Sequence, residues 1–401
     1  MSVYLTIKPK AQKVSHIWRT GIQRNYSGNE KRTMLYTWPR IKLNASFLAL
    51  RDNKINWIKR NLIYSSDSLW SVPIWLDKTL LTAQASSGQK IISVAETDYR
   101  HFYQGRKCLL VKPSDFTVYE AATMSTISSV EIITTSNLVS TWPAGSFIFP
   151  LYDCRLSPEQ EISINSAIMR NTILDLEFVE AYETARSFTY TAPSSGAATY
   201  HGEDVFIQPL HKPLSYKFNR PGELLQFLGI GYFDSELALG RNFMTMKSSI
   251  RRLSRQDLWE TFTFFDSKQG RLGQFWVPTW AKDIVVTQAI LSTDTVINIE
   301  DIEYGTFYLN NEIIGRHIYI QFPDGSYTFK KIVDAATTTI TLHEAIGTTV
   351  LGNGLSKVLI CFLMLARFDM DTLTMNYIDG DKGMADLSFC GLLDSSTLAT
   401  L

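Results

Sequence analysis

The feature that most constrains the fold of this chain is an internal repeat. The element Val72-Pro73-Ile74-Trp75 returns as Val277-Pro278-Thr279-Trp280, at an offset of 277 − 72 = 205 residues. An aromatic residue precedes both copies, Trp70 in the first and Phe275 in the second. Further matches follow in the same order along the chain. Such an ordered series predicts two tandem homologous halves.

The repeat also predicts the domain organisation. The matches run as far as Arg155 and Arg367, where the offset is 367 − 155 = 212 residues. The low-complexity stretch 191–199 is rich in small and turn-forming residues and suits a flexible connection between the halves. We expect a first repeat at 1–200 with an inserted β-module at about 77–155, and a second repeat at 201–401 with an inserted β-module at about 282–367.

The inserted modules have the sequence pattern of short β-strands. Apolar and polar residues alternate in several short runs, and β-branched and aromatic residues dominate them. Turn-forming residues separate these runs, for example at Asn310-Asn311, Pro323-Asp324-Gly325 and Gly352-Asn353-Gly354. The pattern predicts a mainly β (α+β) fold in which each half carries a helix and an inserted small β-barrel or sandwich. The runs in the second half are 284–287, 295–299, 317–322, 327–333 and 339–342.

One helix is predicted before each module. In the second half Ser254 is a suitable N-cap, Leu258, Phe262 and Phe265 share a helix face, and Gly270 offers a C-terminal stop. The first half has a weaker copy near residues 52–64. The aromatic face of the second helix indicates core packing.

Composition excludes several classes of protein. The 401 residues carry 39 Lys and Arg against 39 Asp and Glu, so no net charge attracts nucleic acid and no nucleic-acid binding is expected. The longest apolar stretch, 358–366, is too short to span a bilayer, so no membrane insertion is expected. The four cysteines lack paired spacing and are interpreted as buried apolar residues in a reducing compartment. They are Cys108, Cys154, Cys361 and Cys390.

No local motif for catalysis or cofactor binding occurs. The six histidines form no metal-ligand pattern, and the sequence has no nucleophile elbow or phosphate-binding loop. The acidic group Glu300-Asp301-Ile302-Glu303 fits a solvated turn between strands better than a glycosidase or calcium site. We therefore predict no catalytic, cofactor-binding or metal-binding residues and expect a protein that is not an enzyme.

The segment 258–280 carries a family resemblance. Paired aromatics at Phe264-Phe265 end a helix, a turn follows at Gly270-Arg271, and a strand follows with Phe275-Trp276-Val277-Pro278 and then Trp280. This arrangement resembles the distal tail and minor tail proteins found at the tail tip of long-tailed bacteriophages and gene transfer agents. The first half has Ser65-Ser66-Asp67-Ser68 in place of the turn, so Trp70, Pro73 and Trp75 belong to the motif only through the internal repeat.

The resemblance implies a structural virion protein of the tail tip or baseplate. Such a protein forms an oligomeric ring, here a trimer or a hexamer, that connects the tail tube protein to the baseplate hub or tail fibre proteins. Its location would be the virion tail, after assembly in the cytoplasm of the host bacterium. A trimer of two-half chains would present six similar units.

Two alternative functions remain at this point. The chain is rich in tryptophan and tyrosine, which stack on sugars when exposed, so it could be a carbohydrate-binding tail protein that recognises a receptor. A tail-associated polysaccharide hydrolase that uses carboxylates is the other alternative. For Trp276 and Trp280 we predict a structural role, in which both indoles cover the helix face around Phe262 and Phe265.

Overall fold

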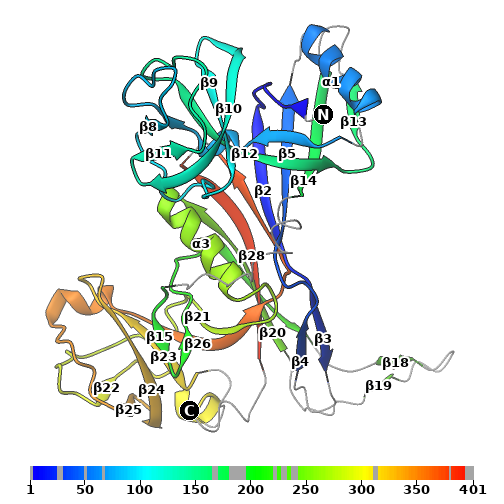
Figure 1. Cartoon of the computed structure of the whole chain (residues 1–401). Coiled ribbons are helices and arrows are strands. Elements are labelled where there is room, and N and C mark those ends of the chain that lie inside the picture. Colours follow the sequence, from blue (N-terminus) through cyan, green and yellow to red (C-terminus); the bar gives the residue numbers. More distant parts are fainter. Residues whose placement is uncertain are drawn as a thin grey trace.

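The computed structural model describes residues 3–24, 30–48, 52–65, 68–164, 170–179, 196–219, 224–226, 233–235, 243–309, 315–378 and 381–392. Over these ranges the chain is mainly β, with a large antiparallel sheet and few helices (Figure 1). The predicted fold class is confirmed in this respect. The predicted turn at Asn310-Asn311 and most of the connection 191–199 lie outside the described residues.

The first half consists mainly of strands and contains one long helix. The helices are α1 (Asp52–Tyr64) and the short 3-10 helix η1 (Trp75–Asp77). The strands are β1 (Val3–Tyr4), β2 (Ala11–Ile17), β3 (Thr20–Arg24), β4 (Glu30–Met34), β5 (Arg40–Leu48), β6 (Trp70–Pro73), β7 (Thr79–Leu80), β8 (Ile91–Ser93), β9 (Lys107–Lys112), β10 (Asp115–Ser128), β11 (Glu131–Thr134), β12 (Phe147–Leu156), β13 (Glu161–Ile164) and β14 (Arg170–Phe178).

The second half has a similar series of elements. Its helices are α3 (Arg255–Ser267), α4 (Tyr304–Phe307) and the 3-10 helix η2 (Gly352–Lys357). Its strands are β15 (Thr199–Tyr200), β16 (Glu203–Asp204), β17 (His211–Asn219), β18 (Leu224–Gln226), β19 (Phe233–Ser235), β20 (Phe243–Arg252), β21 (Gln274–Pro278), β22 (Val296–Asn298), β23 (His317–Gln321), β24 (Tyr327–Ala336), β25 (Thr339–Leu342), β26 (Leu359–Phe368), β27 (Thr372–Tyr377) and β28 (Gly383–Gly391).

The strands pair in the same order in the two halves. In the first half the order is β2-β5-β14-β12-β6, and in the second it is β17-β20-β28-β26-β21. The inserted modules agree as well, with β12-β9-β10-β11-β8 against β26-β23-β24-β25-β22. The descent of the halves from one ancestral unit stays a prediction, which superposition of the two backbones tests.

The register of the repeated Val-Pro element agrees with the sequence offsets. Pro73 lies opposite Leu151 in the β6–β12 pair, and Pro278 lies opposite Leu363 in the β21–β26 pair. These positions differ by 278 − 73 = 205 and 363 − 151 = 212 residues, which are the two offsets in the sequence. The same cross-strand contact is therefore built twice.

The inserted modules are not closed barrels, so of the two predicted forms, barrel or sandwich, the barrel is wrong. Among the described residues, the ends of the first module meet through the short β7–β12 pair and the isolated bridge Leu81↔Val94, and those of the second through the isolated bridges Ile284↔Ile360 and Val286↔Ile299. Each module nevertheless encloses its own apolar core. The predicted strand 284–287 is reduced to these isolated bridges, and the predicted turn at Gly352-Asn353-Gly354 lies in the 3-10 helix η2.

Both predicted helices are present. α3 begins after Ser254, whose side chain accepts a hydrogen bond from the Asp257 amide, and α1 spans Asp52–Tyr64. The chain reverses after α3 at Gly270, which has a positive φ of 66°. A positive φ favours glycine because a side chain would clash with the backbone.

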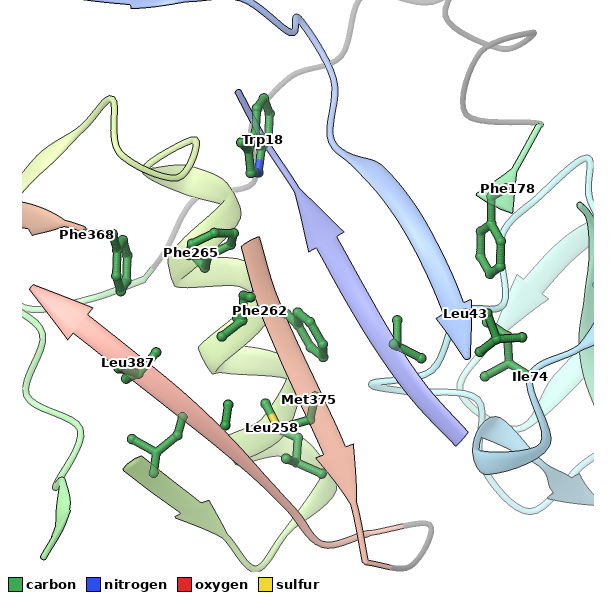
Figure 2. Packing of buried hydrophobic residues seen from close by; sticks show 14 of the residues in the cluster. Trp18, Leu43, Ile74, Phe178, Leu258, Phe262, Phe265, Phe368, Met375 and Leu387 are labelled. Atoms are coloured by element: carbon green, nitrogen blue, oxygen red, sulfur yellow. The ribbon is translucent and has the colours of Figure 1, made fainter. Parts of the chain in front are cut away.

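The two halves share one central core. β2 of the first half pairs with β27 of the second, and one apolar cluster contains Trp18 and Leu43 as well as Phe265 and Phe368. Figure 2 shows α3 lying between Trp18 on one side and the strands that carry Phe368 and Leu387 on the other. The halves are therefore joined by packing as well as by the chain connection.

Candidate functional site

The Gly270-Arg271 turn lies where the two halves meet. The Arg271 amide donates to Asp371 Oδ1 over 3.1 Å, and the amide and hydroxyl of Thr20 donate to the same carboxylate over 3.0 Å each. A Cβ added at Gly270 would lie 2.8 Å from Asp371 Oδ1 and 3.0 Å from Trp18 Cβ. The motif turn thus connects the end of α3, the end of β2 and the start of β27. We call this region the junction.

The aromatic residues of the motif fill the core beside the junction. Phe264 lies 5.1 Å from Phe275, Phe265 lies 5.1 Å from Phe368, and Phe275 lies 4.7 Å from Phe368, measured between ring centroids. Phe264, Phe265 and Phe275 are buried. They are brought together as packing residues and present no surface to a ligand.

Trp276, Pro278 and Trp280 are separated from this group, and the prediction that both indoles cover α3 is wrong. Phe275 and Val277 point to the α3 core, whereas Trp276 belongs to a second apolar cluster with Tyr319 and Leu365. Successive residues of a strand face opposite sides, so Phe275 and Trp276 cannot both contact the helix. Trp280 packs on Tyr319 over 5.6 Å.

The first-half counterparts divide in a similar way. Trp70 is buried in the central core, and its indole lies 6.0 Å from Trp57 of α1. Pro73 is buried at the end of β6, while Trp75 packs on Phe149 of the inserted module over 4.6 Å. Trp75 and Trp280 therefore occupy corresponding places against the two modules.

A buried polar network completes the junction. Asp77 accepts hydrogen bonds from the amide and Nδ1 of His101 over 2.8 and 2.5 Å, and it forms an ion pair with Arg255 at the start of α3. Asp266 at the end of α3 accepts from His16 Nδ1 over 2.7 Å and from Trp18 Nε1 over 2.9 Å. Each acid thereby joins residues of both halves.

Burial controls the protonation of this network. Burial lowers the pKa of His101 to about 3, so its ring stays neutral and Asp77 takes its countercharge from Arg255. Burial also lowers the pKa of the Arg255 guanidinium. Because His16, Asp77, His101 and Asp266 are all buried, the network holds the halves together and is closed to a substrate.

The sequence reasoning missed this network. Its members come from β2, η1, the loop after β8 and α3, so no local spacing connects them. The one signal available was Asp266, an acid that directly follows the paired aromatics on the buried side of the predicted helix. An acid at such a position needs a buried partner.

An open cleft in the first half is a separate candidate site. Its volume is about 990 Å³, and it lies between β1, α1 and the β9–β10 hairpin. Four aromatic side chains line it, together with hydroxyl, amide, lysine and carboxylate groups. The aromatic residues are Tyr4, Trp57, Phe116 and Tyr119.

The described lining of the cleft contains no pair of carboxylates. Among the cleft residues that the structure describes, Asp115 is the one acid, and hydrogen bonds from the Thr117 hydroxyl and amide lower its pKa. A glycosidase needs a second carboxylate, and its general acid needs a raised pKa. The group at Glu300, Asp301 and Glu303 forms a turn in which the Glu303 amide donates to Asp301.

Other kinds of site are also missing from the described part of the chain. There, no three His, Cys, Asp or Glu residues are placed to hold a metal ion. No described helix is long and apolar enough to cross a membrane. The four cysteines are buried, as the sequence predicts.

Comparison with known proteins adds no constraint on the site. No protein-family model and no characterised protein matches the chain.

Proposed function

We propose that this protein is a structural component of a bacteriophage tail tip or baseplate, where copies form a ring between the tail tube and the hub or fibres. The observation that carries the proposal is the junction, where unlike strand edges of two similarly paired β-units are joined. A protein that already joins two such units inside one chain is suited to join more of them between chains. The resemblance of segment 258–280 to tail-tip proteins supports the same role.

The position of the motif residues supports a structural role over an enzymatic one. Gly270 and Arg271 hold the junction, and Phe264, Phe265 and Phe275 pack beneath it. A ring subunit has to resist deformation, and a shared core with a buried ion pair provides that resistance.

Cryo-electron microscopy of purified tailed particles containing this protein tests the proposal. We expect several copies in a closed ring on the tail axis, between tube and hub. A single copy, an appendage away from the axis, or absence from the particle would contradict it.

The cleft favours a second candidate function, the binding of carbohydrate. Tyr4 and Tyr119 lie 5.6 Å apart between ring centroids, and Trp57, Lys8 and Asp115 line the same cleft. Aromatic faces stack on sugar rings, while polar groups bind their hydroxyls.

A glycan array screened with the purified chain tests this second function. We expect binding that is lost in Trp57→Ala and Tyr119→Ala and retained in Phe307→Ala, which removes an exposed ring far from the cleft residues in the sequence. Binding that survives both cleft substitutions would remove the cleft as its site.

A further inference from the structure

Within one chain the junction includes the β2–β27 pair. This pair shows how an edge of the first half fits an edge of the second half. β2 and β27 pair over five residues, from Lys13↔Asn376 to Ile17↔Thr372. Val14 and Met375 are buried there, and the hydroxyls of Ser15 and Thr374 lie 2.8 Å apart. This antiparallel contact is therefore complete in hydrogen bonding and in packing.

Among the described residues, the corresponding strands of the other two edges, β13 in the first half and β17 in the second, lack this contact. By pairing order, β17 is the counterpart of β2 and β13 is the counterpart of β27. In the part of the chain that the structure describes, β17 pairs only with β20, and β13 pairs only with β14. Each of the two strands therefore has an edge with no described strand beside it.

Both unpaired edges carry exposed apolar side chains. Phe218 on β17 is 63% exposed and Ile164 on β13 is 66% exposed, and Ile173 on the adjacent β14 is exposed as well. Free edges in soluble proteins are normally protected by charge, proline or short length. Here β13 spans four residues and β17 contains Pro213, yet both edges keep exposed apolar side chains. Apolar groups along such an edge mark a surface that another chain covers.

Charge on the two edges is complementary. Lys217 is exposed on β17, and Glu161 is exposed on β13 next to the exposed Glu159. Opposite charges on surfaces that meet favour association in one orientation. Two β17 edges would bring like charges together, and so would two β13 edges. The contact therefore joins unlike surfaces.

The paired strands β3 and β4, which we call the arm, form a further part of the junction. A similar contact could form between two copies of the chain. The arm follows β2 and reaches the second half, where Glu30 accepts from Arg367 Nε over 2.7 Å. In the first half the residue at the place of Arg367 is Arg155, which is exposed. The β18–β19 pair follows β17 as the arm follows β2, and among described residues it pairs with no other strand.

We infer that β17 of one copy pairs with β13 of a second copy, repeating the β2–β27 junction between chains. The occupant of each free edge is thus another copy of this protein, bound head to tail. Such a contact leaves new free edges until the chain of copies closes into a ring. The inference rests on the proposed function for this closure and goes beyond it by naming the two surfaces that meet.

The first test measures the oligomer of the purified full chain by native mass spectrometry and light scattering. We expect three or six copies, and a dissociation constant raised at least about tenfold by Phe218→Lys or Ile164→Lys, which place a charge in the contact. Phe307→Lys and Val139→Lys are matched controls, since these residues are 62% and 81% exposed outside both edges. All four variants should fold, with equal melting temperatures when measured under conditions in which the chain is monomeric.

The second test identifies the contact itself. A photoreactive phenylalanine at position 218, in a mixture of isotope-labelled and unlabelled chains, should crosslink to residues 157–164 of another copy. A monomer at high concentration, an oligomer insensitive to both edge substitutions, or crosslinks to another segment would overturn the inference. The last two results would leave the ring function intact, because imaging of the particle tests that function separately.

Discussion

Helices α1 and α3 occupy the same place in the two halves but have different surroundings. α3 is covered by β2, where the His16 ring lies 4.3 Å from Phe262, and by the first module, where His101 lies 5.1 Å from Trp259. α1 borders the open cleft instead, and Ile63 and Tyr64 at its end are exposed. The repeat therefore determines each helix and its strands, whereas the neighbouring half determines which helix is buried.

The largest effect is expected from Arg255 of α3. Arg255→Met leaves the Asp77 carboxylate buried without its countercharge, which should reduce the free energy of unfolding by about 3–5 kcal/mol. Arg60→Met makes the same change on an exposed position of α1 and should stay within about 0.5 kcal/mol. Urea denaturation of both variants measures the difference, and equal losses would contradict the comparison of the helices.

Trp276 and Trp280 should differ in their contribution to stability. Trp276 is fully buried and its Nε1 donates to the Tyr200 carbonyl over 3.0 Å, so Trp276→Ala should cost about 3–5 kcal/mol. Trp280 is only partly buried, and Trp280→Ala should cost less. Thermal melts of the two variants measure this order. Unchanged melting temperatures for both would remove the structural role of the motif.

The substitution Gly270→Ala tests how tightly the junction is packed. Gly270→Ala and Gly325→Ala introduce a side chain at φ values of 66° and 87°, so both carry the strain of a positive φ, about 1 kcal/mol. A Cβ at Gly325 meets nothing within 4 Å, whereas one at Gly270 meets Asp371 and Trp18. We expect Gly270→Ala to cost about 1–3 kcal/mol more in chemical denaturation. Equal costs would show that the junction adapts to the methyl group.

The effect of pH is gradual, and here the halves should behave alike. Burial lowers the pKa of His101 in the first half and of His317 in the second to about 3. The unfolded chain takes up these protons near pH 6.5 and the folded chain does not, so stability is lost as pH falls from about 6.5 towards 3. The slope is at most about 1.4 kcal/mol per pH unit for each residue.

Unfolding free energies measured between pH 7 and 4 test this expectation. His101→Gln and His317→Gln should each flatten the dependence, while His343→Gln, at an exposed position, should leave it unchanged. A steeper loss in either buried variant would contradict the neutral state of that histidine in the folded chain.

The sequence by itself determined the local and periodic features of this protein. Strand alternation and turn residues predicted a mainly β fold, and the N-cap at Ser254 and the stop at Gly270 predicted the limits of α3. The offsets of 205 and 212 residues predicted which positions of the two halves correspond, and the registers of β6–β12 and β21–β26 agree with them. These features depend on short-range geometry, or on comparing the chain with itself, so one sequence is sufficient for them.

Only the tertiary structure decided which surfaces meet. Phe275 and Trp276 are both large and apolar, so strand alternation cannot tell which of them faces α3. Asp77 and Asp266 acquire their partners from strands and loops far away in the chain, and no local pattern predicts those contacts. β2 and β17 have corresponding places in the sheet, yet among the described strands β2 pairs with both β5 and β27, whereas β17 pairs with β20 alone. The reason is that the backbone groups along an edge strand are hydrogen-bonded by a neighbouring strand, and the position of that neighbour depends on the whole fold.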